Sequence, residues 1–175
     1  MLDTEIEMAE VYLQPGEAYL AREPTIIRTL LGSCVGVTFW SPRLGFGALC
    51  HALLPRCPQN PRHGMTLAEG YRFVDFSIRE LGRKFDKLGA LRGEVEVKMF
   101  GGSDVLPVCG GATRGATVGK QNCEAAMEVV KAEGFRLAAS SLGGTRGRSI
   151  QLNTRTGEVQ LRWLSRAVLE RGCER

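Results

Sequence analysis

The sequence predicts an α+β fold, a layered α/β sandwich in which a mostly antiparallel sheet carries two main helices. Strand-like patterns come before, between and after two helical patterns, and a hairpin pattern occurs near each end of the chain. The length of 175 residues suits one domain with a sizeable core. We expect a single domain over residues 1–175, with its core at about 8–165 and a charged tail at 166–175.

The first third of the chain is expected to form strands. Val35 to Trp40 alternates apolar and small or polar residues, and Ser41-Pro42-Arg43-Leu44 has the proline position of a type I turn. A return strand then runs to Leu54, and Pro55 ends it. The segments expected before this hairpin are two short strands within 8–22 around a turn at 14–16, and a buried segment at 26–31.

Two amphipathic helices are expected in the middle of the chain. The first follows the polar loop 56–66: Thr66 and Glu69 match a capping box, and apolar residues continue at helical spacing to Phe85. The second spans roughly 119–133, and Gly134 is placed to cap its end. We expect its buried face to carry Cys123, Ala126, Met127 and Val130.

The remaining segments are expected to be strands. Glu94 to Phe100 alternates cleanly, with Val95, Val97 and Met99 facing inward. A short strand at 135–140 follows the second helix, and 150–163 has the pattern of a hairpin that turns at 154–157.

Composition excludes several classes of protein. The net charge is +4, but Lys and Arg are scattered among Asp and Glu, so nucleic-acid binding is not expected. The acidic N-terminus lacks the pattern of a signal peptide, and no apolar run approaches the ~20 residues of a membrane span, so we expect a cytoplasmic protein without membrane insertion. The six cysteines and two histidines show no zinc pattern, and we expect no metal or cofactor.

Cys34 and His51 are the candidate reactive pair. If Pro42 and Arg43 form the centre of a two-residue turn, residue 34 pairs with residue 51 on the neighbouring antiparallel strand. Their Cβ atoms would then lie about 4.5–5.5 Å apart, close enough for a thiol–imidazole hydrogen bond. A bulge near Gly45 or Gly47 would shift this register.

Such a pair has the parts of a cysteine hydrolase. A neighbouring histidine lowers a thiol pKa and supplies thiolate near neutral pH. Gly32 and Ser33 precede Cys34, and a sharp turn there would aim backbone amides at a developing oxyanion. These groups suffice for acyl transfer. The pattern alone leaves open a packed Cys–His pair without chemistry.

Other candidates have simpler interpretations. His63 lies in a polar loop, and Cys50 should face the opposite side of the sheet from His51 and pack there. The glycine pairs 101–102 and 143–144 lack the spacing of a phosphate-binding loop, so we interpret them as turns. A thiol redox sensor remains an alternative, in which Cys50 or Cys57 would approach Cys34.

Several segments together resemble the CheD family of chemoreceptor glutamine deamidases. The specific combination is Leu31-Gly32-Ser33-Cys34-Val35 followed by His51-Ala52-Leu53-Leu54-Pro55. The resemblance spans roughly 11–164, and its other motifs are Val11 to Glu17, Lys98 to Gly102, Val118 to Asn122, Leu142 to Arg148 and Thr156 to Val159.

The resemblance implies a function and a site. It implies a fold like that of toxin-type deamidases and conversion of receptor glutamine to glutamate on cytoplasmic receptor helices. The family's cysteine and histidine fall on Cys34 and His51, and its third catalytic residue, a threonine, falls on Thr29, with Arg28 at the alternative position. Some members bind a CheC-type phosphatase. A non-catalytic adaptor of the same adaptation system is the alternative, and hydrolysis of glutamyl methyl esters is a chemically reasonable side activity.

Overall fold

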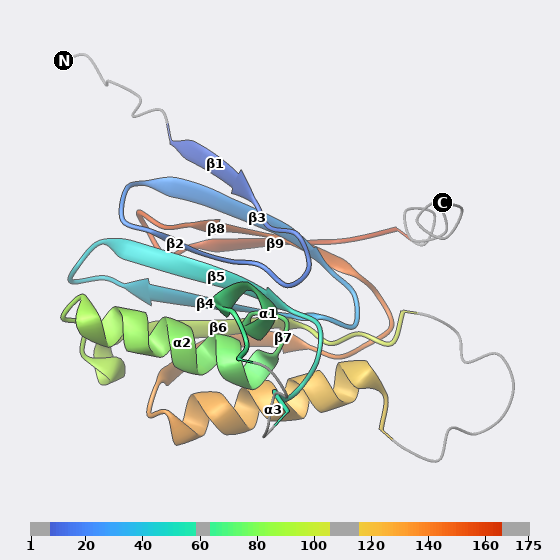
Figure 1. Cartoon of the computed structure of the whole chain (residues 1–175). Helices are drawn as coiled ribbons and strands as arrows, with labels where there is room; N and C mark the ends of the chain where they lie inside the picture. The colour runs from blue at the N-terminus through green and yellow to red at the C-terminus, as the bar shows by residue number, and fades with distance from the viewer. Residues whose placement is uncertain (1–7, 59–63, 106–115, 166–175) are drawn as a thin grey trace, which may run out of the picture.

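The described residues of the computed structural model, 8–58, 64–105 and 116–165, form three layers, which are two β-sheets and a layer of helices (Figure 1). The uppermost sheet in Figure 1 has the strand order β1-β3-β8-β9, and the middle sheet has the order β2-β5-β4-β6-β7. The strands are β1 (Ala9–Tyr12), β2 (Ala18–Ala21), β3 (Thr25–Leu31), β4 (Val35–Ser41), β5 (Phe46–Ala52), β6 (Glu96–Gly101), β7 (Arg136–Leu142), β8 (Arg148–Asn153) and β9 (Val159–Trp163).

The predicted α+β layered class is confirmed, but the expected single sheet is two sheets. The helices are α1 (Leu67–Gly70), α2 (Val74–Lys87) and α3 (Val118–Ala132), with a short 3-10 turn, η1, at Arg92–Glu94. Most strand pairs are antiparallel, as expected; β1 with β3 and β6 with β7 are the parallel ones among the described strands.

Two separate apolar clusters explain the order of the layers. One lies between the sheets, and its buried residues include Ile27, Leu49 and Ile150. The other lies between the middle sheet and the helices, and includes Phe39, Ile78 and Phe85. Because the middle sheet is covered on both faces, nearly every residue of β4 and β5 is buried, which the alternation of Val35 to Trp40 alone did not predict.

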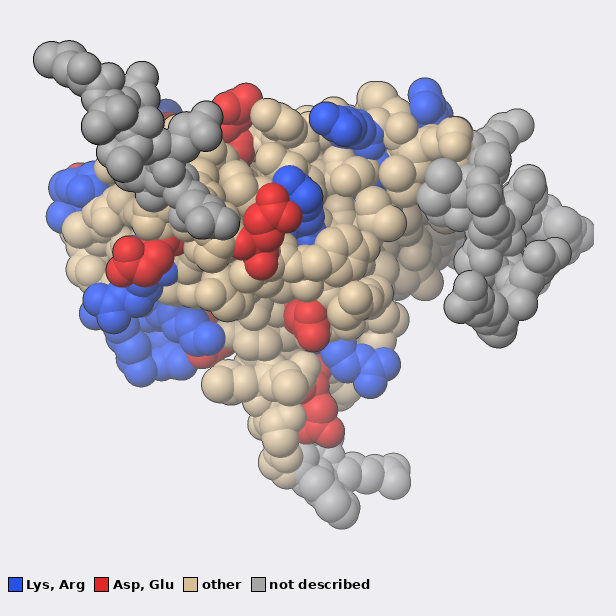
Figure 2. All heavy atoms as spheres, turned by 90° about the horizontal axis from the view of Figure 1, so that it is seen from above, with Lys and Arg blue, Asp and Glu red and all other residues tan. Residues whose placement is uncertain are grey.

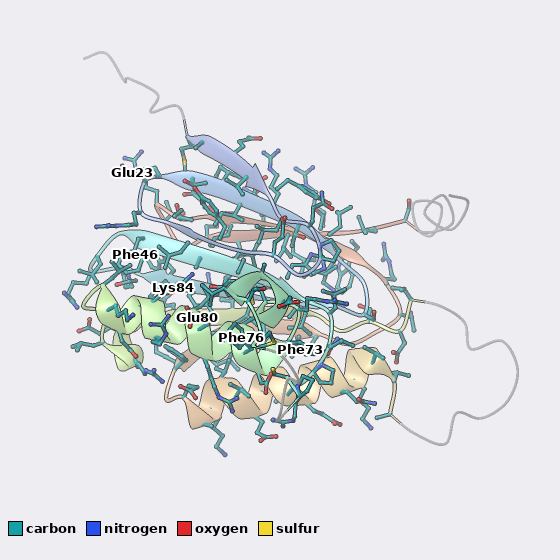
Figure 3. All side chains as sticks on the ribbon, in the orientation of Figure 1. Glu23, Phe46, Phe73, Phe76, Glu80 and Lys84 are labelled. Carbon is teal, nitrogen blue, oxygen red and sulfur yellow. The ribbon has the colours of Figure 1, made fainter. Side chains whose placement is uncertain are left out.

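The single long helix predicted after residue 66 is wrong. The predicted capping box of Thr66 and Glu69 is present, but the helix that it starts ends at Gly70. Phe73 then takes an extended conformation and forms a parallel β-bridge with Leu54 before α2 begins. Figure 3 shows Phe73 and Phe76 where α1 meets α2, and a side chain at residue 70 would collide with the Phe76 ring. The helical spacing is interrupted because Phe73 leaves the helical conformation to pair with Leu54.

The predicted register of the β4–β5 hairpin is also wrong. Ser41 pairs with Phe46, so the connection has four residues, 42–45, rather than two. Gly45 adopts a positive φ of 69° and its N–H donates to the carbonyl of Ser41 over 2.8 Å, which closes the longer turn. As a result, His51 lies opposite Gly36 and not opposite Cys34.

The buried face of α3 differs from the prediction at two positions. Ala126 and Val130 are buried as expected, whereas Met127 is exposed and Cys123 is only partly buried. Asn122 is completely buried instead. The buried face of α3 therefore includes a polar residue, which the spacing of apolar residues could not predict.

Charged side chains at the surface lie mostly in mixed groups. On the face that Figure 2 shows, the basic and acidic side chains of the described residues form small groups between broad uncharged areas. Among the described residues, none of the helices is both long and apolar enough to cross a membrane.

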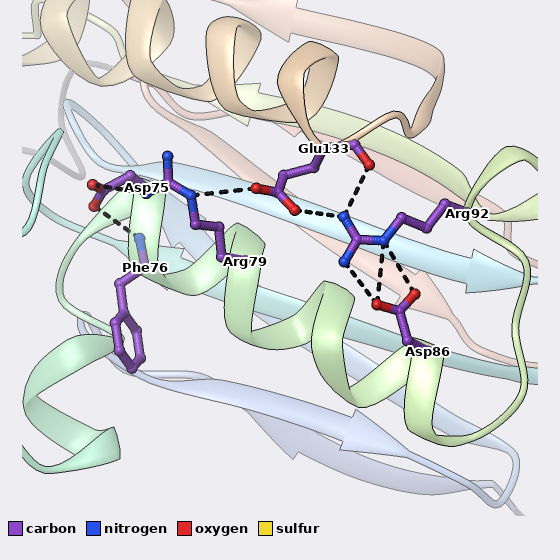
Figure 4. Close-up of polar contacts among 6 residues, drawn as sticks. All are labelled: Asp75, Phe76, Arg79, Asp86, Arg92 and Glu133. Atoms are coloured by element: carbon purple, nitrogen blue, oxygen red, sulfur yellow. Dashed lines mark hydrogen bonds and ion pairs between the residues drawn. The ribbon is translucent and has the colours of Figure 1, made fainter.

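An ion-pair network connects α2, η1 and the C-terminal end of α3 (Figure 4). The Arg92 guanidinium donates to both carboxylate oxygens of Asp86 and to the carboxylate of Glu133, and it lies 5.1 Å from the centre of the Phe135 ring. Arg79 pairs with the same Glu133 and with Asp75. These partners raise the pKa of Arg92 further above its ordinary value, and the largest cause is the hydrogen bond that Arg92 donates to Asp86.

We expect Arg92→Ala to lower the free energy of unfolding by roughly 1–2 kcal/mol, because it removes a bidentate ion pair and a cation–π contact. Urea unfolding should show a lower midpoint with an unchanged slope, and 1 M salt should reduce the difference. Arg155→Ala, at an exposed position with no ion pair among the described residues, is the matched control. Equal midpoints for the two variants would contradict this role.

Candidate active site

His51 is held by backbone bonds on one side and by a side chain on the other. Its carbonyl accepts from the N–H of Gly16 over 2.7 Å, and its own N–H donates to the carbonyl of Glu17 over 2.8 Å. The turn at 14–17 thus fixes the main chain of β5 at this position. The imidazole is buried, with 3% of His51 exposed, and lies on the side of the middle sheet that faces β3.

The Thr29 side chain connects the imidazole to the other sheet. Its Oγ1 lies 2.7 Å from Nδ1 of His51 and donates to the Leu13 carbonyl over 2.9 Å. A hydroxyl has one proton, so Oγ1 must accept from His51, and Nδ1 must carry a hydrogen. In the neutral ring, Nε2 is then unprotonated and can accept a proton. The structure therefore brings together Thr29 and His51, whereas the side chain of the alternative, Arg28, pairs with Glu10 and Gln151.

Burial keeps the imidazole neutral. Loss of hydration lowers the pKa of His51 from 6.5 to about 4, and the negative charge of Glu17 opposes this shift. The Glu17 carboxylate is held near the ring by a 2.8 Å bond from the N–H of Gln14. At neutral pH, the ring is ready to accept a proton.

Cys34 lies where the chain crosses from one sheet to the other. Residues 32–34 connect β3 of the upper sheet to β4 of the middle sheet, and the partly buried Cys34 packs against the apolar cluster between the sheets. Since His51 lies opposite Gly36, Cys34 lies two residues before the position opposite His51. The two residues are therefore diagonal neighbours and not direct partners. No hydrogen bond joins Cys34 to His51 among the described residues, in contrast to the prediction. Such bonds often form only when substrate binds.

The Cys34 thiol loses its proton less readily than the sequence indicated. Burial raises the pKa of Cys34 above its ordinary value, and the contact with its own backbone amide opposes this effect. The expected lowering of the pKa by a histidine partner is therefore wrong for this structure. The raised pKa of the Cys34 thiol and the lowered pKa of the His51 imidazole both favour the neutral forms of these groups at neutral pH.

The carbonyl groups of the crossover turn all point to donors within the protein. The Gly32 carbonyl accepts from the N–H of Ser103, and the Cys34 carbonyl accepts from the N–H of Gly102, both over 2.8 Å. The Ser33 carbonyl accepts from the Asn122 amide over 2.9 Å. Among the described residues, no acceptor pairs with the N–H groups of Ser33 and Cys34. Apart from the contact of the Cys34 amide with its own thiol, both amides are unpaired within the part of the chain that the structure describes.

Two glycines make this arrangement possible. Gly101 and Gly102 have φ values of 103° and 66°, which favour glycine. A side chain at residue 101 would collide with the carbonyl of Cys34. The turn predicted at this glycine pair is wrong, because Gly101 is the last residue of β6 and pairs with Val35, and its missing side chain leaves room for the Cys34 carbonyl. The spacing of the glycines did not reveal that contact, because it depends on the pairing of β4 with β6.

The remaining sequence candidates lie away from this group. Cys50 is fully buried in the cluster under the helices, as predicted, and burial raises its pKa to about 12. Cys57 contacts Met65. Neither cysteine is a hydrogen-bond partner of Cys34 within the described part of the chain, which disfavours the redox-sensor alternative. His63 lies outside the described residues.

Comparison with known proteins identifies related sequences. The family model described as "CheD chemotactic sensory transduction" matches residues 53–163. A relative from Geobacter sulfurreducens, named "Probable chemoreceptor glutamine deamidase CheD 2", is 42% identical over 161 residues, covering 91% of this chain and 93% of its own. A relative from Maridesulfovibrio salexigens, "Probable chemoreceptor glutamine deamidase CheD", is 34% identical over 172 residues, covering 95% and 96%.

These alignments include the candidate site. The family-model match starts at residue 53, after both Cys34 and His51. An alignment that spans 91% of the chain, however, must include both residues whichever end it omits. A further relative from Thermococcus kodakarensis, 36% identical over 157 residues, covers 89% of this chain and 94% of its own.

The neutral, buried imidazole gives a pH-dependence that NMR can measure. The resonances that disappear in His51→Gln should titrate with a midpoint near pH 4 in the folded protein, whereas an unfolded histidine titrates near 6.5. Between these values the unfolded chain binds a proton that the folded chain does not, so the free energy of unfolding should fall as pH drops from 6.5 to 4. His51→Gln should flatten that slope. A midpoint near 6.5 in the folded protein would show a hydrated ring and contradict this geometry.

Proposed function

The chain belongs to the CheD family, and from that premise we propose that it converts glutamine side chains of chemotaxis receptors to glutamate, with Cys34 as nucleophile and His51 as base. One observation carries the residue assignment. Thr29 accepts from Nδ1 of His51 while it donates to Leu13, which leaves Nε2 as the proton acceptor. The ring is thereby prepared for proton transfer before any substrate binds.

The first half-reaction forms a thioester. His51 Nε2 removes the proton from the Cys34 thiol as Sγ attacks the carboxamide carbon of glutamine. The N–H groups of Ser33 and Cys34, without acceptors from other residues among those described, stabilise the oxyanion, and the bond from Ser103 N–H to the Gly32 carbonyl holds the turn that presents them. The tetrahedral intermediate then breaks its C–N bond, and protonated His51 gives its proton to the departing ammonia.

The second half-reaction releases the product. Water gives a proton to His51 and attacks the thioester carbon, the C–S bond breaks, and the proton returns to Sγ. The sum is one water consumed, one ammonia released, and one glutamate formed. Since both groups start neutral, the site does not maintain a buried charge pair between turnovers. Residues of this chain carry every step.

The substrate implies where the protein works. The glutamines are on the cytoplasmic helices of the receptors, so the chain acts in the cytoplasm. A CheC-type phosphatase is the second partner that we propose, because such a partner would link deamidation to receptor adaptation.

Replacement of the nucleophile tests the reaction class. We expect Cys34→Ala to reduce deamidation of receptor cytoplasmic fragments by at least about a thousandfold while the melting temperature stays near that of the wild type. Mass spectrometry should detect a gain of about one dalton at glutamine with the wild type and none with the variant. Cys57→Ala, at a partly buried cysteine outside the proposed site, is the matched control. Retained activity in Cys34→Ala would rule out this mechanism.

A second substitution tests the group that orients the base. Thr29→Val keeps the shape of the side chain but removes the acceptor for Nδ1–H, so kcat should fall on the order of a hundredfold. Thr29→Ser should retain most activity because it keeps the hydroxyl. Thr38→Val changes an equally buried threonine whose hydroxyl, within the described part of the chain, bonds to the Lys98 carbonyl alone, at 3.4 Å. Equal kcat values for Thr29→Val and Thr38→Val would exclude a catalytic use of the Thr29 hydroxyl.

A further inference from the structure

Asn122 bridges the segments that carry the two proposed catalytic residues. It lies in the N-terminal part of α3, is completely buried, and its Nδ2 donates to the carbonyls of both Ser33 and Leu53 over 2.9 Å. Ser33 directly precedes the nucleophile, and Leu53 is two residues beyond the base. The start of β4, the end of β5 and this end of α3 therefore meet on one side of the molecule (Figure 1).

The Asn122 bridge lies just beyond the point where backbone pairing between β4 and β5 ends. The last backbone pair of the hairpin at this end is Val35 with Ala52. Beyond it, the carbonyls of Ser33 and Leu53 both require donors, and two acceptors cannot bond to each other. The Asn122 amide fits between them as an additional cross-link. A side chain at residue 119, one turn earlier, would collide with the carbonyl of Gly102, so α3 is close to the crossover turn at a second point.

The chemistry of the bridge requires an amide. An NH2 group has two hydrogens on one atom, so a single side chain can serve both carbonyls at once. The orientation of the amide is determined, because a flipped group would place Oδ1 against two carbonyl oxygens. Among the described residues, no donor reaches Asn122 Oδ1. A buried acceptor without a donor costs folding free energy, so stability alone does not explain asparagine at this position.

We propose that Asn122 is a positioning residue, which fixes the distance between Cys34 and His51 by clamping Ser33 to Leu53. Because no part of Asn122 is exposed, it cannot contact a receptor helix. Its effect must pass through the two strands. Loss of the clamp should therefore lower kcat and leave KM unchanged, since a displacement of about 1 Å between reacting groups can cost a hundredfold in rate.

The experiment compares two truncations in the same helix. Asn122→Ala removes the clamp, and Val129→Ala removes buried side-chain volume from α3 without touching the site. We expect kcat on receptor fragments to fall about 30- to 100-fold in Asn122→Ala, with KM within about twofold, and to stay within about twofold in Val129→Ala. The kcat of Asn122→Ser, which keeps one donor, should lie between the values of the wild type and Asn122→Ala. This variant replaces Asn122→Ala in the test if the alanine variant does not fold. Melting temperatures of all variants separate this effect from lost stability.

A second measurement does not depend on activity. Amide hydrogen exchange should accelerate in Asn122→Ala at residues 35–36 and 51–54 but not in the centre of β4 and β5. This inference rests on the proposed function, and the results distinguish the two failures. A wild type that deamidates no receptor glutamine refutes the function. An active wild type with equal kcat in Asn122→Ala and Val129→Ala, or without local acceleration of exchange, refutes the clamp.

Discussion

The crossover between the two sheets is the constraint on which the proposed site depends. Over residues 32–34 the chain leaves one sheet and enters the other, and each of the three carbonyls binds a donor from another part of the chain. In the proposed mechanism the oxyanion binds the amides of Ser33 and Cys34, which have no acceptor from another residue in the described part of the chain. Gly101 and Gly102 are required there, since a side chain at residue 101 would occupy the position of the Cys34 carbonyl.

The base and its orienting group come from different layers. His51 lies on β5 of the middle sheet, and Thr29 lies on β3 of the sheet above it. The hydrogen bond between them crosses the interface that the apolar cluster of Ile27, Leu49 and Ile150 holds together. In the proposed mechanism, packing of the sheets thus sets the geometry of proton transfer. Burial in the same interface keeps the imidazole neutral, which is the protonation state that a base needs.

The sequence predicted the strands and most of the two long helices, because apolar spacing and local motifs encode these features, whereas the roles of Cys34 and His51 stay predictions. It could not predict their exact relation in space. The position of Gly45 in a four-residue turn changed the hairpin register, and the bridge between Phe73 and Leu54 divided the first helix. The separate upper sheet pairs β1 and β3 with β8 and β9, which are more than a hundred residues away, so local patterns did not reveal it.

Asn122 shows the same limit at the site itself. A polar residue in a helix is normally assigned to the surface, and only the tertiary structure shows that its amide meets two carbonyls from distant segments. Thr29, by contrast, was identified through the family resemblance. Its hydroxyl reaches the ring only because the turn at 14–17 and the packing of β3 place Leu13 and His51 on either side of it.

The central claim is that Cys34 forms a covalent acyl intermediate, and trapping that intermediate tests it most directly. Wild-type protein mixed in excess with a receptor fragment and quenched with acid within the first turnover should contain the fragment joined to Cys34, with loss of ammonia. Hydroxylamine should release the adduct, because it cleaves thioesters. Deamidation that proceeds in the same single turnover without any adduct at Cys34, or with the adduct on another residue, would contradict the account.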